Sequence, residues 1–493
     1  FFCEFSGFNF YSLFFTQQNE MSPRENENEH SFPLKYSMVG QLSTGDQGTL
    51  RELYGSCSGA KRPWNHAESF KTPAFVETII IGAGPGGLAL SHELNKKGKV
   101  HIILEKNCTL HSWKTARWDD FSLFTPPGIS KLGGQKNTKS SSMEMCDSEN
   151  LKDLLSSWEK YVEENHFPVY QGCEVESVKE STQVPGLLLV TVLWERSRYN
   201  FHAKNVVGAV GLFQSPRRHP EAAKINKNIR QFDGRTFKNP DQLAPGKVLV
   251  VGSGISGVQV TEMLAKAGKQ VLLATSRSRG TPRTYRGKDI FYWFDKLGVL
   301  YQEKSSLRSV DDIYGSRAPM LGKTKALSFF QLARLGVEMY GYFDKVEGNK
   351  LHFDDSLSSN VEYSINSYFQ CRAMLETKIL HGGLGDKFEE PSAEPEWAPY
   401  EPLLARCSNC PSELDLVEAG VTNVIWLTGW DSNLDWCQVD SVREDFGKEN
   451  VPIKLETPHP GFHWLGFHFA KSRSSSFLCG LVNDAKVLAD RLC

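Results

Sequence analysis

The stretch VETIIIGAGPGGLALSHELNKKGKVHIILEK, residues 76–106, decides the fold. It opens on a short apolar run at 76–81, which is typical of a strand buried on both faces of a parallel sheet. Three glycines in G-x-G-x-x-G spacing come immediately after this run. A helix is then expected over 88–97, and a second strand over 100–104. The stretch therefore predicts a β–α–β unit of the kind that binds a dinucleotide.

Each of the three glycines has a physical task in such a unit. Gly82 permits the tight turn, Gly84 lets the backbone approach a pyrophosphate, and Gly87 lets helix and strand pack closely. Glu105 lies at the end of the second strand, where a carboxylate can accept hydrogen bonds from a ribose. The alternative is an ordinary strand–turn–helix without a ligand. The residues predicted to bind the first dinucleotide are Gly82, Gly84, Pro85, Gly86, Gly87, Glu105 and Lys106.

A second copy of the pattern, KVLVVGSGISGVQVTEMLAKAGKQVLLATSRSR, occupies residues 247–279. A buried strand is expected over 248–251, a helix over 258–267 and the next strand over 271–273. The glycine spacing is repeated between the first strand and the helix. The chain therefore carries two dinucleotide-binding units, about 170 residues apart.

The second unit differs from the first just beyond its second strand. No acid ends that strand, and the next loop contains Ser276, Arg277 and Arg279. An acid would repel a ribose 2′-phosphate, whereas serine and arginine can bind it, so this site favours NADP over NAD. The alternative is that the two arginines are solvated loop charges. The predicted ligands here are Gly252, Ser253, Gly254, Ser256, Gly257, Ser276, Arg277 and Arg279.

An acidic first site and a basic second site imply two different ligands, and the natural pair is FAD first and NADPH second. Further stretches along the chain extend the pattern; they are residues 112–121, 125–127, 276–291, 424–430 and 474–485. From Phe75 onwards, the chain resembles the two-dinucleotide flavoproteins that include flavin-containing and Baeyer–Villiger monooxygenases, and bacterial-type relatives in particular.

The resemblance implies roles for three residues near the flavin. Arg117 and Thr125 are the candidate catalytic groups, and Trp113 is a candidate cofactor-binding wall. The alternatives are that Arg117 only binds the FAD pyrophosphate and that Trp113 belongs to the core.

One departure from the resemblance concerns the segment before the second unit. The family usually carries a histidine there, with an aromatic four residues later. In this chain Asp233 and Phe237 occupy the two places. An ionised carboxylate only accepts hydrogen bonds, so Asp233 cannot make the contact that a histidine donates. This difference predicts normal flavin reduction with a leak to hydrogen peroxide, and Asp233→His is expected to reduce the leak if the backbone is preserved.

The order of the motifs predicts an α/β fold with two Rossmann-like domains, the NADP domain inserted into the FAD domain. The predicted parts are a disordered leader at 1–70, the FAD domain at 71–241 and 421–493, and the NADP domain at 242–420. Met21 is a candidate start, in which case residues 1–20 would not be translated. A hairpin is expected over 341–353 and an exposed loop over 389–402.

Composition narrows the function classes. The 493 residues are 40% hydrophobic with a net charge of −2, so no global basic field exists to hold nucleic acid. No apolar stretch approaches the length of a spanning helix. Eleven scattered cysteines suit a reducing, cytoplasmic location. Cys407 and Cys410 are interpreted as loop cysteines rather than a redox pair, and no metal site is expected.

The sequence thus predicts an NADPH-dependent FAD monooxygenase. It would insert one oxygen atom from O2 into a small organic substrate, either a soft nitrogen or sulfur nucleophile or a carbonyl compound. Two alternatives stay open: an NADPH oxidase or reductase of the same fold, and a weakened flavoprotein with a regulatory role. Neither nucleic acid nor a membrane-spanning segment is expected to take part.

Overall fold

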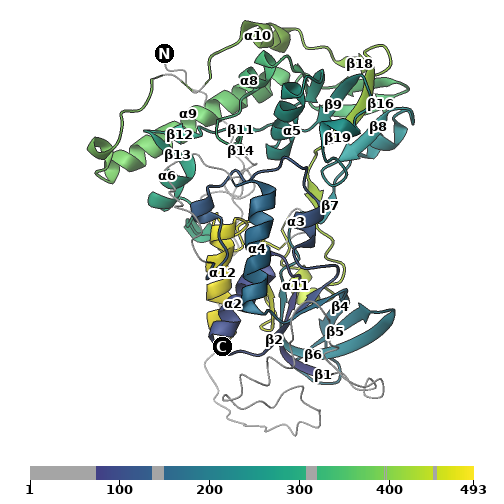
Figure 1. Ribbon diagram of the computed structural model, residues 1–493, viewed down its shortest axis with the longest axis vertical. Helices are drawn as coiled ribbons and strands as arrows, with labels where there is room; N and C mark the ends of the chain where they lie inside the picture. Colours follow the sequence, from purple (N-terminus) through teal and green to yellow (C-terminus); the bar gives the residue numbers. More distant parts are fainter. Residues whose placement is uncertain are drawn as a thin grey trace, which may run out of the picture. The chain divides into compact units, whose positions relative to one another are not determined.

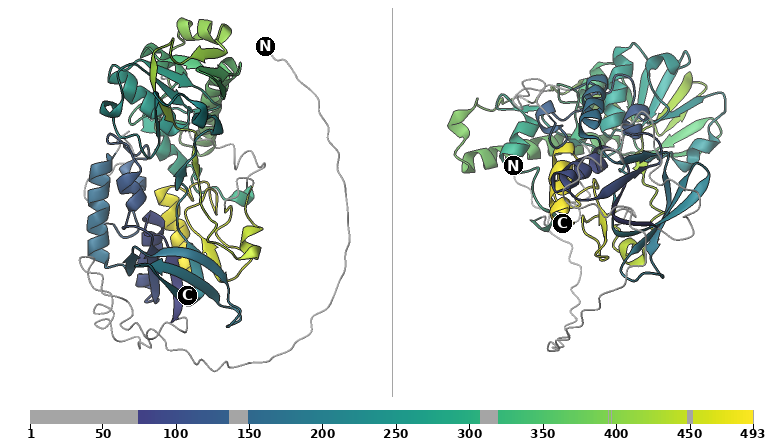
Figure 2. Two further views of the ribbon diagram at one scale, coloured as in Figure 1. Left: turned by 90° about the vertical axis from the view of Figure 1, so that its right-hand side faces the viewer. Right: turned by 60° about the horizontal axis from the view of Figure 1, so that its bottom comes forward.

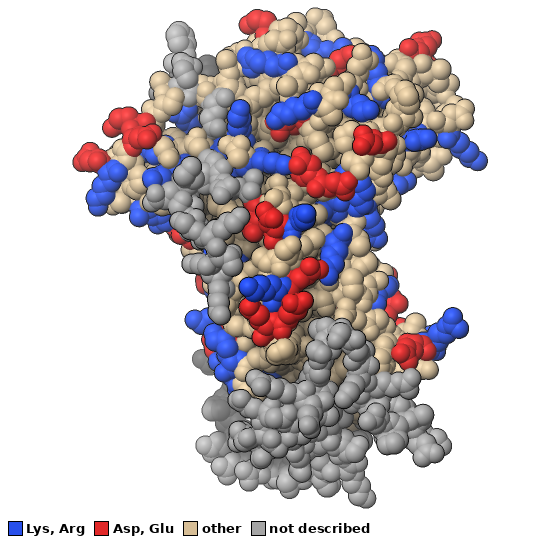
Figure 3. Space-filling model, viewed as in Figure 1, with Lys and Arg blue, Asp and Glu red and all other residues tan. Residues whose placement is uncertain are grey.

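The computed structural model describes residues 74–135, 149–306, 319–393, 395, 397–447 and 452–492. The predicted leader at 1–70 lies outside these residues. On the face shown in Figure 3, Lys and Arg side chains are interspersed with Asp and Glu side chains over the described part of the chain. Among the described helices, none is both long and apolar enough to cross a membrane.

The first dinucleotide stretch forms the middle of a seven-stranded sheet (Figure 1). Its strands are β1 (Ala74–Ile81), β2 (His101–Glu105), β3 (Val169–Gln171), β4 (Glu174–Glu180), β5 (Leu188–Trp194), β6 (Ser197–Gly208) and β21 (Phe462–Trp464). The order is β3-β2-β1-β6-β5-β4, with β21 also paired to β6. β1 is parallel to β2 and β6, which fits the apolar run Ile79–Ile81 at its end, whereas β4, β5 and β6 are antiparallel.

Helices from both ends of the described chain cover this sheet. α2 (Pro85–Lys96) begins at the first glycine turn, and α12 (Leu478–Arg491) packs beside it, as Figures 1 and 2 show. Leu481, Ala485 and Leu488 give α12 a buried face at helical spacing. The same part of the chain also contains α3 (His111–Thr115), α4 (Leu151–Asn165) and, before β21, α11 (Asp440–Arg443).

The second dinucleotide stretch forms the middle of a five-stranded sheet. Its strands are β8 (Arg230–Asp233), β9 (Lys247–Val251), β10 (Val271–Ala274), β15 (Glu338–Tyr340) and β19 (Val421–Trp426). All pairs are parallel, in the order β15-β10-β9-β19-β8. The helices between or beside these strands are α5 (Ile255–Lys266), α6 (Ile290–Lys296), α8 (Phe329–Arg334), α9 (Leu357–His381) and α10 (Glu401–Ser408). The expected α/β fold with two dinucleotide-binding units is confirmed.

Two strands lie in the second sheet, although the predicted boundaries assign them to the FAD domain. β19 pairs with β9 on one side and with β8 on the other, through main-chain hydrogen bonds. The strand at 421–426 therefore belongs to the second sheet, although the predicted boundaries place it in the FAD domain. The domain boundaries themselves stay predictions, and strand pairing argues for moving them outward to include both strands.

Short paired segments complete the fold. They are β11 (Arg279–Gly280) with β14 (Pro319–Met320), β12 (Thr284–Tyr285) with β13 (Lys288–Asp289), β7 (Ser215–Pro216) with β20 (Trp430–Asp431), and β16 (Phe343–Glu347) with β17 (Lys350–Phe353) and β18 (Glu413–Asp415). The antiparallel pairing of β16 and β17 confirms the expected hairpin. β7 leads from the first sheet to the second and β20 leads back, so the two crossings run side by side.

Candidate functional site

At two glycines of the first turn, Gly82 and Gly87, a side chain cannot fit. Gly82 has a φ of +103°, and a Cβ there would lie 2.7 Å from the carbonyl oxygen of Ala209. A Cβ on Gly87 would lie 2.0 Å from the carbonyl oxygen of Gly82. Gly86 has room for a Cβ at 3.4 Å from Leu481 of α12. Two of the glycines are therefore fixed by the close packing of strand, turn and helix.

The second turn repeats this geometry. Gly252 has a φ of +107°, and a Cβ there would lie 2.5 Å from the carbonyl oxygen of Leu427. A Cβ on Gly257 would lie 1.9 Å from the carbonyl oxygen of Gly252. The two turns are built alike even though their sequences differ at the intervening positions.

The middle glycine of each turn differs from its neighbours. A Cβ on Gly84 or on Gly254 would meet no atom of the chain within 4 Å. Each is the N-cap residue of its helix, α2 or α5, and neither cap carries a side-chain hydrogen bond to the helix. The N-termini of both helices therefore stand beside open space, which is what a pyrophosphate requires, and in α2 the first N–H is that of Gly86 because Pro85 has none. Pro85 and Ser256 lie in the first turns of these helices.

Glu105 lies against the first turn. Its Oε2 accepts a hydrogen bond from the Ala83 amide at 2.9 Å, and its Oε1 accepts one from the Asn107 amide at 2.8 Å. The carboxylate is thus held at the end of β2, next to the glycines, where a ribose would lie. Lys106 is directed elsewhere: its Nζ lies 2.5 Å from Glu174 of β4, in an exposed ion pair. The structure brings Glu105 to the site and does not bring Lys106.

Serines join the second turn to the loop after β10. The buried Ser253 hydroxyl accepts from the Ser276 amide at 2.8 Å and lies 2.9 Å from the Ser278 hydroxyl. The Ser278 hydroxyl also donates to the Ser253 carbonyl at 2.6 Å. This network fixes the loop that carries Arg277 and Arg279 next to the second turn.

Both arginines lie around one aromatic ring that the sequence did not single out. The Arg277 guanidinium carbon is 4.6 Å from the ring centroid of Tyr363, and the Arg279 Nε is 3.5 Å from the Tyr363 hydroxyl. Tyr363 belongs to α9, more than eighty residues further along the chain. No local pattern could have revealed it, because the contact depends on how α9 packs.

Arg117 is enclosed by aromatic rings. Its guanidinium carbon lies 4.8 Å from the ring centroid of Trp113, 5.4 Å from that of Phe121 and 5.8 Å from that of Phe213. Burial lowers the pKa of Arg117 to about 10, so the group stays charged at neutral pH. Trp113 also packs edge-on against Trp158, with 4.9 Å between ring centroids. As placed, Trp113 is a wall between Arg117 and the core.

Thr125 is buried, and its hydroxyl lies 2.7 Å from that of Ser130. The preceding carbonyl, that of Phe124, accepts a hydrogen bond from Arg283 at 2.7 Å. Arg283 is fully buried and forms an ion pair with the equally buried Asp289, at 2.7 Å. This pair fixes the segment that carries Thr125 against the stretch after the second unit. Arg283 lies in the stretch 276–291 that resembles the monooxygenases, but the resemblance assigns it no role.

Asp233 has a structural task in the segment before the second unit. Its Oδ1 accepts from the Arg235 and Thr236 amides, both at 3.0 Å, and its Oδ2 accepts from Arg218 at 2.7 and 2.9 Å. Burial raises the pKa of the Asp233 carboxyl, but the hydrogen bonds from Thr236, Arg218 and Arg235 outweigh it and lower the pKa overall. Phe237, the expected aromatic, is buried. The backbone turn at 233–237 therefore depends on the carboxylate.

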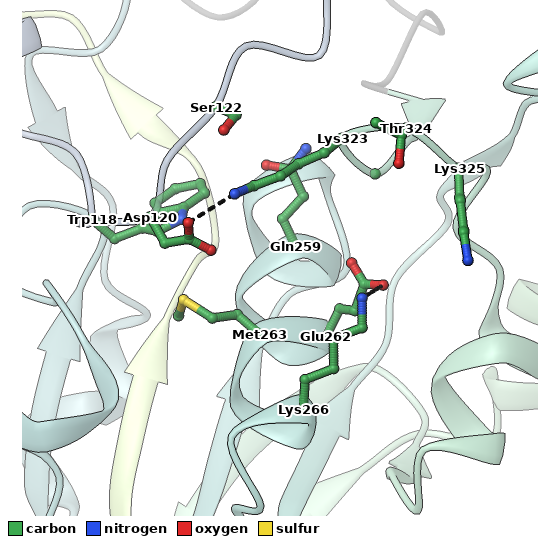
Figure 4. Close-up of a pocket in the computed structure, with 11 residues that line it drawn as sticks. Trp118, Asp120, Ser122, Gln259, Glu262, Met263, Lys266, Lys323, Thr324 and Lys325 are labelled. Carbon is green, nitrogen blue, oxygen red and sulfur yellow. Dashed lines mark hydrogen bonds and ion pairs between the residues drawn. The ribbon is translucent and has the colours of Figure 1, made fainter. Parts of the chain in front are cut away.

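A cavity of about 270 Å³ lies on the flank of α5 (Figure 4). Lys323 pairs with Asp120 at 2.8 Å and Lys266 pairs with Glu262 at 2.6 Å in its wall. The remaining lining residues are Trp118, Ser122, Gln259, Met263, Gly322, Thr324 and Lys325. None of the predicted site residues, all of which the structure describes, lines this cavity.

Cys407 and Cys410 lie at the C-terminal end of α10 and just after it, and both thiols are free. Burial raises the pKa of both, which lowers their reactivity near neutral pH. They lie after β17 in the chain and not in either glycine turn, so nothing in their position favours a redox pair that serves the flavin.

Comparison with known proteins finds relatives in sequence and solved structures of similar fold. Residues 79–294 match the family model described as pyridine nucleotide-disulphide oxidoreductase. The uncharacterized oxidoreductase CzcO of Bacillus velezensis is 26% identical over 417 residues, 84% of this chain and 99% of that protein. The probable indole-3-pyruvate monooxygenase YUCCA9 of Arabidopsis thaliana is 25% identical over 229 residues, 43% of this chain and 50% of that protein.

Solved structures extend the comparison of folds. A flavin-containing monooxygenase from Stenotrophomonas maltophilia superimposes with a TM-score of 0.54 at 14% identity, over 85% of this chain and 98% of that one. The bacillithiol disulfide reductase of Bacillus cereus does so with a TM-score of 0.51 at 16% identity, over the same shares. The expected resemblance is confirmed. The chain is thus related in sequence to the CzcO-like oxidoreductases and has the fold of the flavin-dependent oxidoreductases with two dinucleotide-binding units, flavin-containing monooxygenases among them.

Proposed function

We propose that the protein is an NADPH-dependent flavin monooxygenase that transfers one oxygen atom from O2 to a small organic substrate. The observation that carries the proposal is the pair of glycine turns with unlike surroundings. The open space at Gly84 stands beside Glu105, and the open space at Gly254 stands beside Arg277 and Arg279. An acid suits the ribose of FAD and arginines suit the 2′-phosphate of NADPH.

When bound, the two cofactors would supply the redox chemistry, in which two electrons from NADPH reach O2 through the flavin, one oxygen atom enters the substrate and the other leaves as water. The chain's own groups would bind and orient the two cofactors. The N-termini of α2 and α5 would hold the pyrophosphates, and the Ser253 network would keep the loop with the arginines in place. Arg117 and Thr125 are our candidates for polar groups beside the flavin ring: the first supplies a charge enclosed by aromatic rings, and the second a buried hydroxyl held by Ser130.

An NADPH oxidase that releases hydrogen peroxide is the second candidate, and one observation favours it. The family histidine of the segment before the second unit is replaced by Asp233, whose carboxylate is occupied by Arg218, Arg235 and Thr236. This carboxylate only accepts hydrogen bonds, so it cannot donate one to a cofactor. A leak of electrons to hydrogen peroxide is therefore expected even if oxygen transfer occurs.

NADPH consumption with and without candidate substrates separates these functions. The panel should contain an indole-3-pyruvate, which the names of the plant relatives suggest, together with a thioether, a tertiary amine and a cyclic ketone. A substrate that accelerates NADPH use and carries labelled oxygen from O2 in its product supports the monooxygenase. NADPH use that yields hydrogen peroxide at the same rate with every compound supports the oxidase. Failure of NADPH to reduce the bound flavin would contradict both and favour a regulatory flavoprotein.

A further inference from the structure

The loop at 275–280, which carries both arginines, is held on one side by the second glycine turn. The Ser253 hydroxyl bonds to the Ser276 amide and lies against the Ser278 hydroxyl. Arg277 itself is exposed, so burial does not fix its side chain. Contacts on the opposite side of the loop are therefore needed to hold it.

A polar stripe along α9 provides that support. Asn360 Nδ2 donates to the Thr275 hydroxyl at 3.1 Å, and the Gly280 amide donates to the Ser367 hydroxyl at 2.9 Å. A Cβ on Gly280 would lie 2.2 Å from the carbonyl oxygen of Ser364, so α9 touches the loop backbone. Asn360, Ser364 and Ser367 are buried and succeed one another at helical spacing. They fix the rotation of α9 about its axis and its distance from the loop.

Tyr363 lies within this stripe and meets the two arginines. Its ring is stacked by the Arg277 guanidinium at 4.6 Å, and its hydroxyl lies 3.5 Å from the Arg279 Nε. An arginine stacked on an aromatic face keeps its N–H groups free at the edge of the plane, where they can bind a phosphate. The stacking also restricts a long side chain before any ligand binds, which reduces the entropy lost on binding.

We propose that Tyr363 is a positioning residue for the ribose 2′-phosphate of NADPH, acting through Arg277 and secondarily through Arg279. The inference rests on the proposed function, because it assumes that the second unit binds NADPH. It adds an element to the proposed site. The helix α9, far from the glycine turn in sequence, would hold the arginines of the loop at 275–280 in place for the phosphate.

The test compares the binding of adenosine 2′,5′-bisphosphate with that of adenosine 5′-monophosphate, by titration calorimetry on the purified full chain. The two ligands differ only in the 2′-phosphate, and neither measurement depends on turnover. Tyr363→Leu removes the aromatic face and keeps an apolar side chain, and Tyr363→Phe keeps the face but loses the hydroxyl. Phe369→Leu, an exposed aromatic of the same helix that packs on Trp397, is the matched control.

Tyr363→Leu should weaken the bisphosphate about two- to fivefold and leave the monophosphate unchanged. Tyr363→Phe should bind the bisphosphate nearly as tightly as the unmodified protein, and Phe369→Leu should change neither ligand. In an Arg277→Ala background, Tyr363→Leu should have only a small remaining effect, because the main partner is already gone.

Two outcomes would overturn the inference, and a third would overturn its foundation. If Tyr363→Leu leaves bisphosphate binding unchanged, or weakens both ligands alike, Tyr363 does not position the arginines for the phosphate. If its effect is the same with and without Arg277, it does not act through that residue. If the unmodified protein binds both ligands equally, the NADPH assignment itself fails.

Discussion

Gly84 and Gly87 lie three residues apart, yet the structure gives them different tasks. Gly87 is required by the packing of the protein itself, since a Cβ would collide with the Gly82 carbonyl. Gly84 faces open space, so nothing in the folded chain demands a glycine there. The spacing alone does not distinguish a glycine needed for folding from one needed for a ligand, whereas the structure does.

Gly84→Val should therefore cost the flavin-free protein little, about 1 kcal/mol or less through the poorer N-cap of α2, and should abolish most FAD binding. The holoprotein would lose only the stabilisation that the ligand supplies, about 3 kcal/mol at a hundredfold excess over the Kd. Gly87→Ala is the matched comparison and should destabilise the flavin-free protein by about 1–3 kcal/mol or more, because it overpacks the turn. Urea unfolding of both variants and the flavin content of purified Gly84→Val check this. A fully flavinated Gly84→Val would show that FAD does not bind at this turn.

Arg277 offers a second test at a single residue. Arg277→Ala should raise the Michaelis constant for NADPH about tenfold and leave that for NADH nearly unchanged, because a charge-assisted hydrogen bond is lost. We expect an effect at the lower end of the range for charge-assisted hydrogen bonds, because the Arg277 side chain is exposed and its charge is screened by solvent and salt. Steady-state kinetics with both cofactors give the answer. Equal losses with both would assign Arg277 a structural role.

At the scale of elements, the turn after β8 shows that Asp233 has a structural role of its own, beyond occupying the place where the family usually has a histidine. The sequence predicts that Asp233→His would restore a missing donor. In the structure the Asp233 carboxylate holds the turn itself, through the Arg235 and Thr236 amides and the Arg218 side chain. A histidine cannot replace these acceptors, so the condition attached to the prediction, an unchanged backbone, is not met.

We therefore expect Asp233→His to lower the free energy of unfolding by about 1–3 kcal/mol, because it removes the buried carboxylate that accepts from two amides and from Arg218, and not to reduce hydrogen peroxide release. Asp233→Asn, which keeps one acceptor oxygen, should cost less. Denaturant unfolding together with peroxide quantification distinguishes the two accounts. If Asp233→His has unchanged stability and releases less hydrogen peroxide per NADPH consumed, the prediction made from the sequence is correct.

The pH dependence of the same turn results from the lowered pKa of Asp233. A carboxyl whose folded-state pKa lies below its unfolded value stabilises the fold above the unfolded pKa, about 4, and loses that contribution as the pH falls through the folded pKa. The stability difference between the unmodified protein and Asp233→Ala should thus be largest near neutral pH and shrink below about pH 4. Unfolding free energies measured across this range check it. A difference that grows on acidification would contradict the lowered pKa.

At the scale of the whole molecule, the sequence could predict what is local and repeated. Both glycine turns, their helices and the hairpin of β16 and β17 are encoded in short-range patterns. It could not predict that β19 joins the second sheet, that Tyr363 meets Arg277, or that Arg283 reaches the Phe124 carbonyl. Each of these is a contact between residues far apart in the chain, fixed by packing, and no local pattern encodes it.

The buried pair of Arg283 and Asp289 makes that long-range coupling testable. Asp289→Asn should destabilise the protein by about 3–5 kcal/mol, because it leaves a buried guanidinium without its counter-charge. The double replacement Arg283→Met with Asp289→Leu should cost less than the single one. Urea unfolding of the three proteins gives the comparison. Asp289 also caps α6 by accepting from the Phe291 amide at 2.8 Å. If the double replacement is the more damaging, the pair and this cap together contribute net stability, and the cost of a lone charge is not the main effect.

We propose that this chain binds FAD at the first turn and NADPH at the second, so that electrons pass from NADPH to the flavin. The decisive measurement is anaerobic mixing of the purified protein with NADPH, monitored through the visible absorbance of the flavin. We predict that the protein is isolated yellow and is bleached by NADPH, and that NADH bleaches it only at markedly higher concentration. A protein that cannot be loaded with FAD, or a bound flavin that NADPH leaves oxidised, would contradict the account.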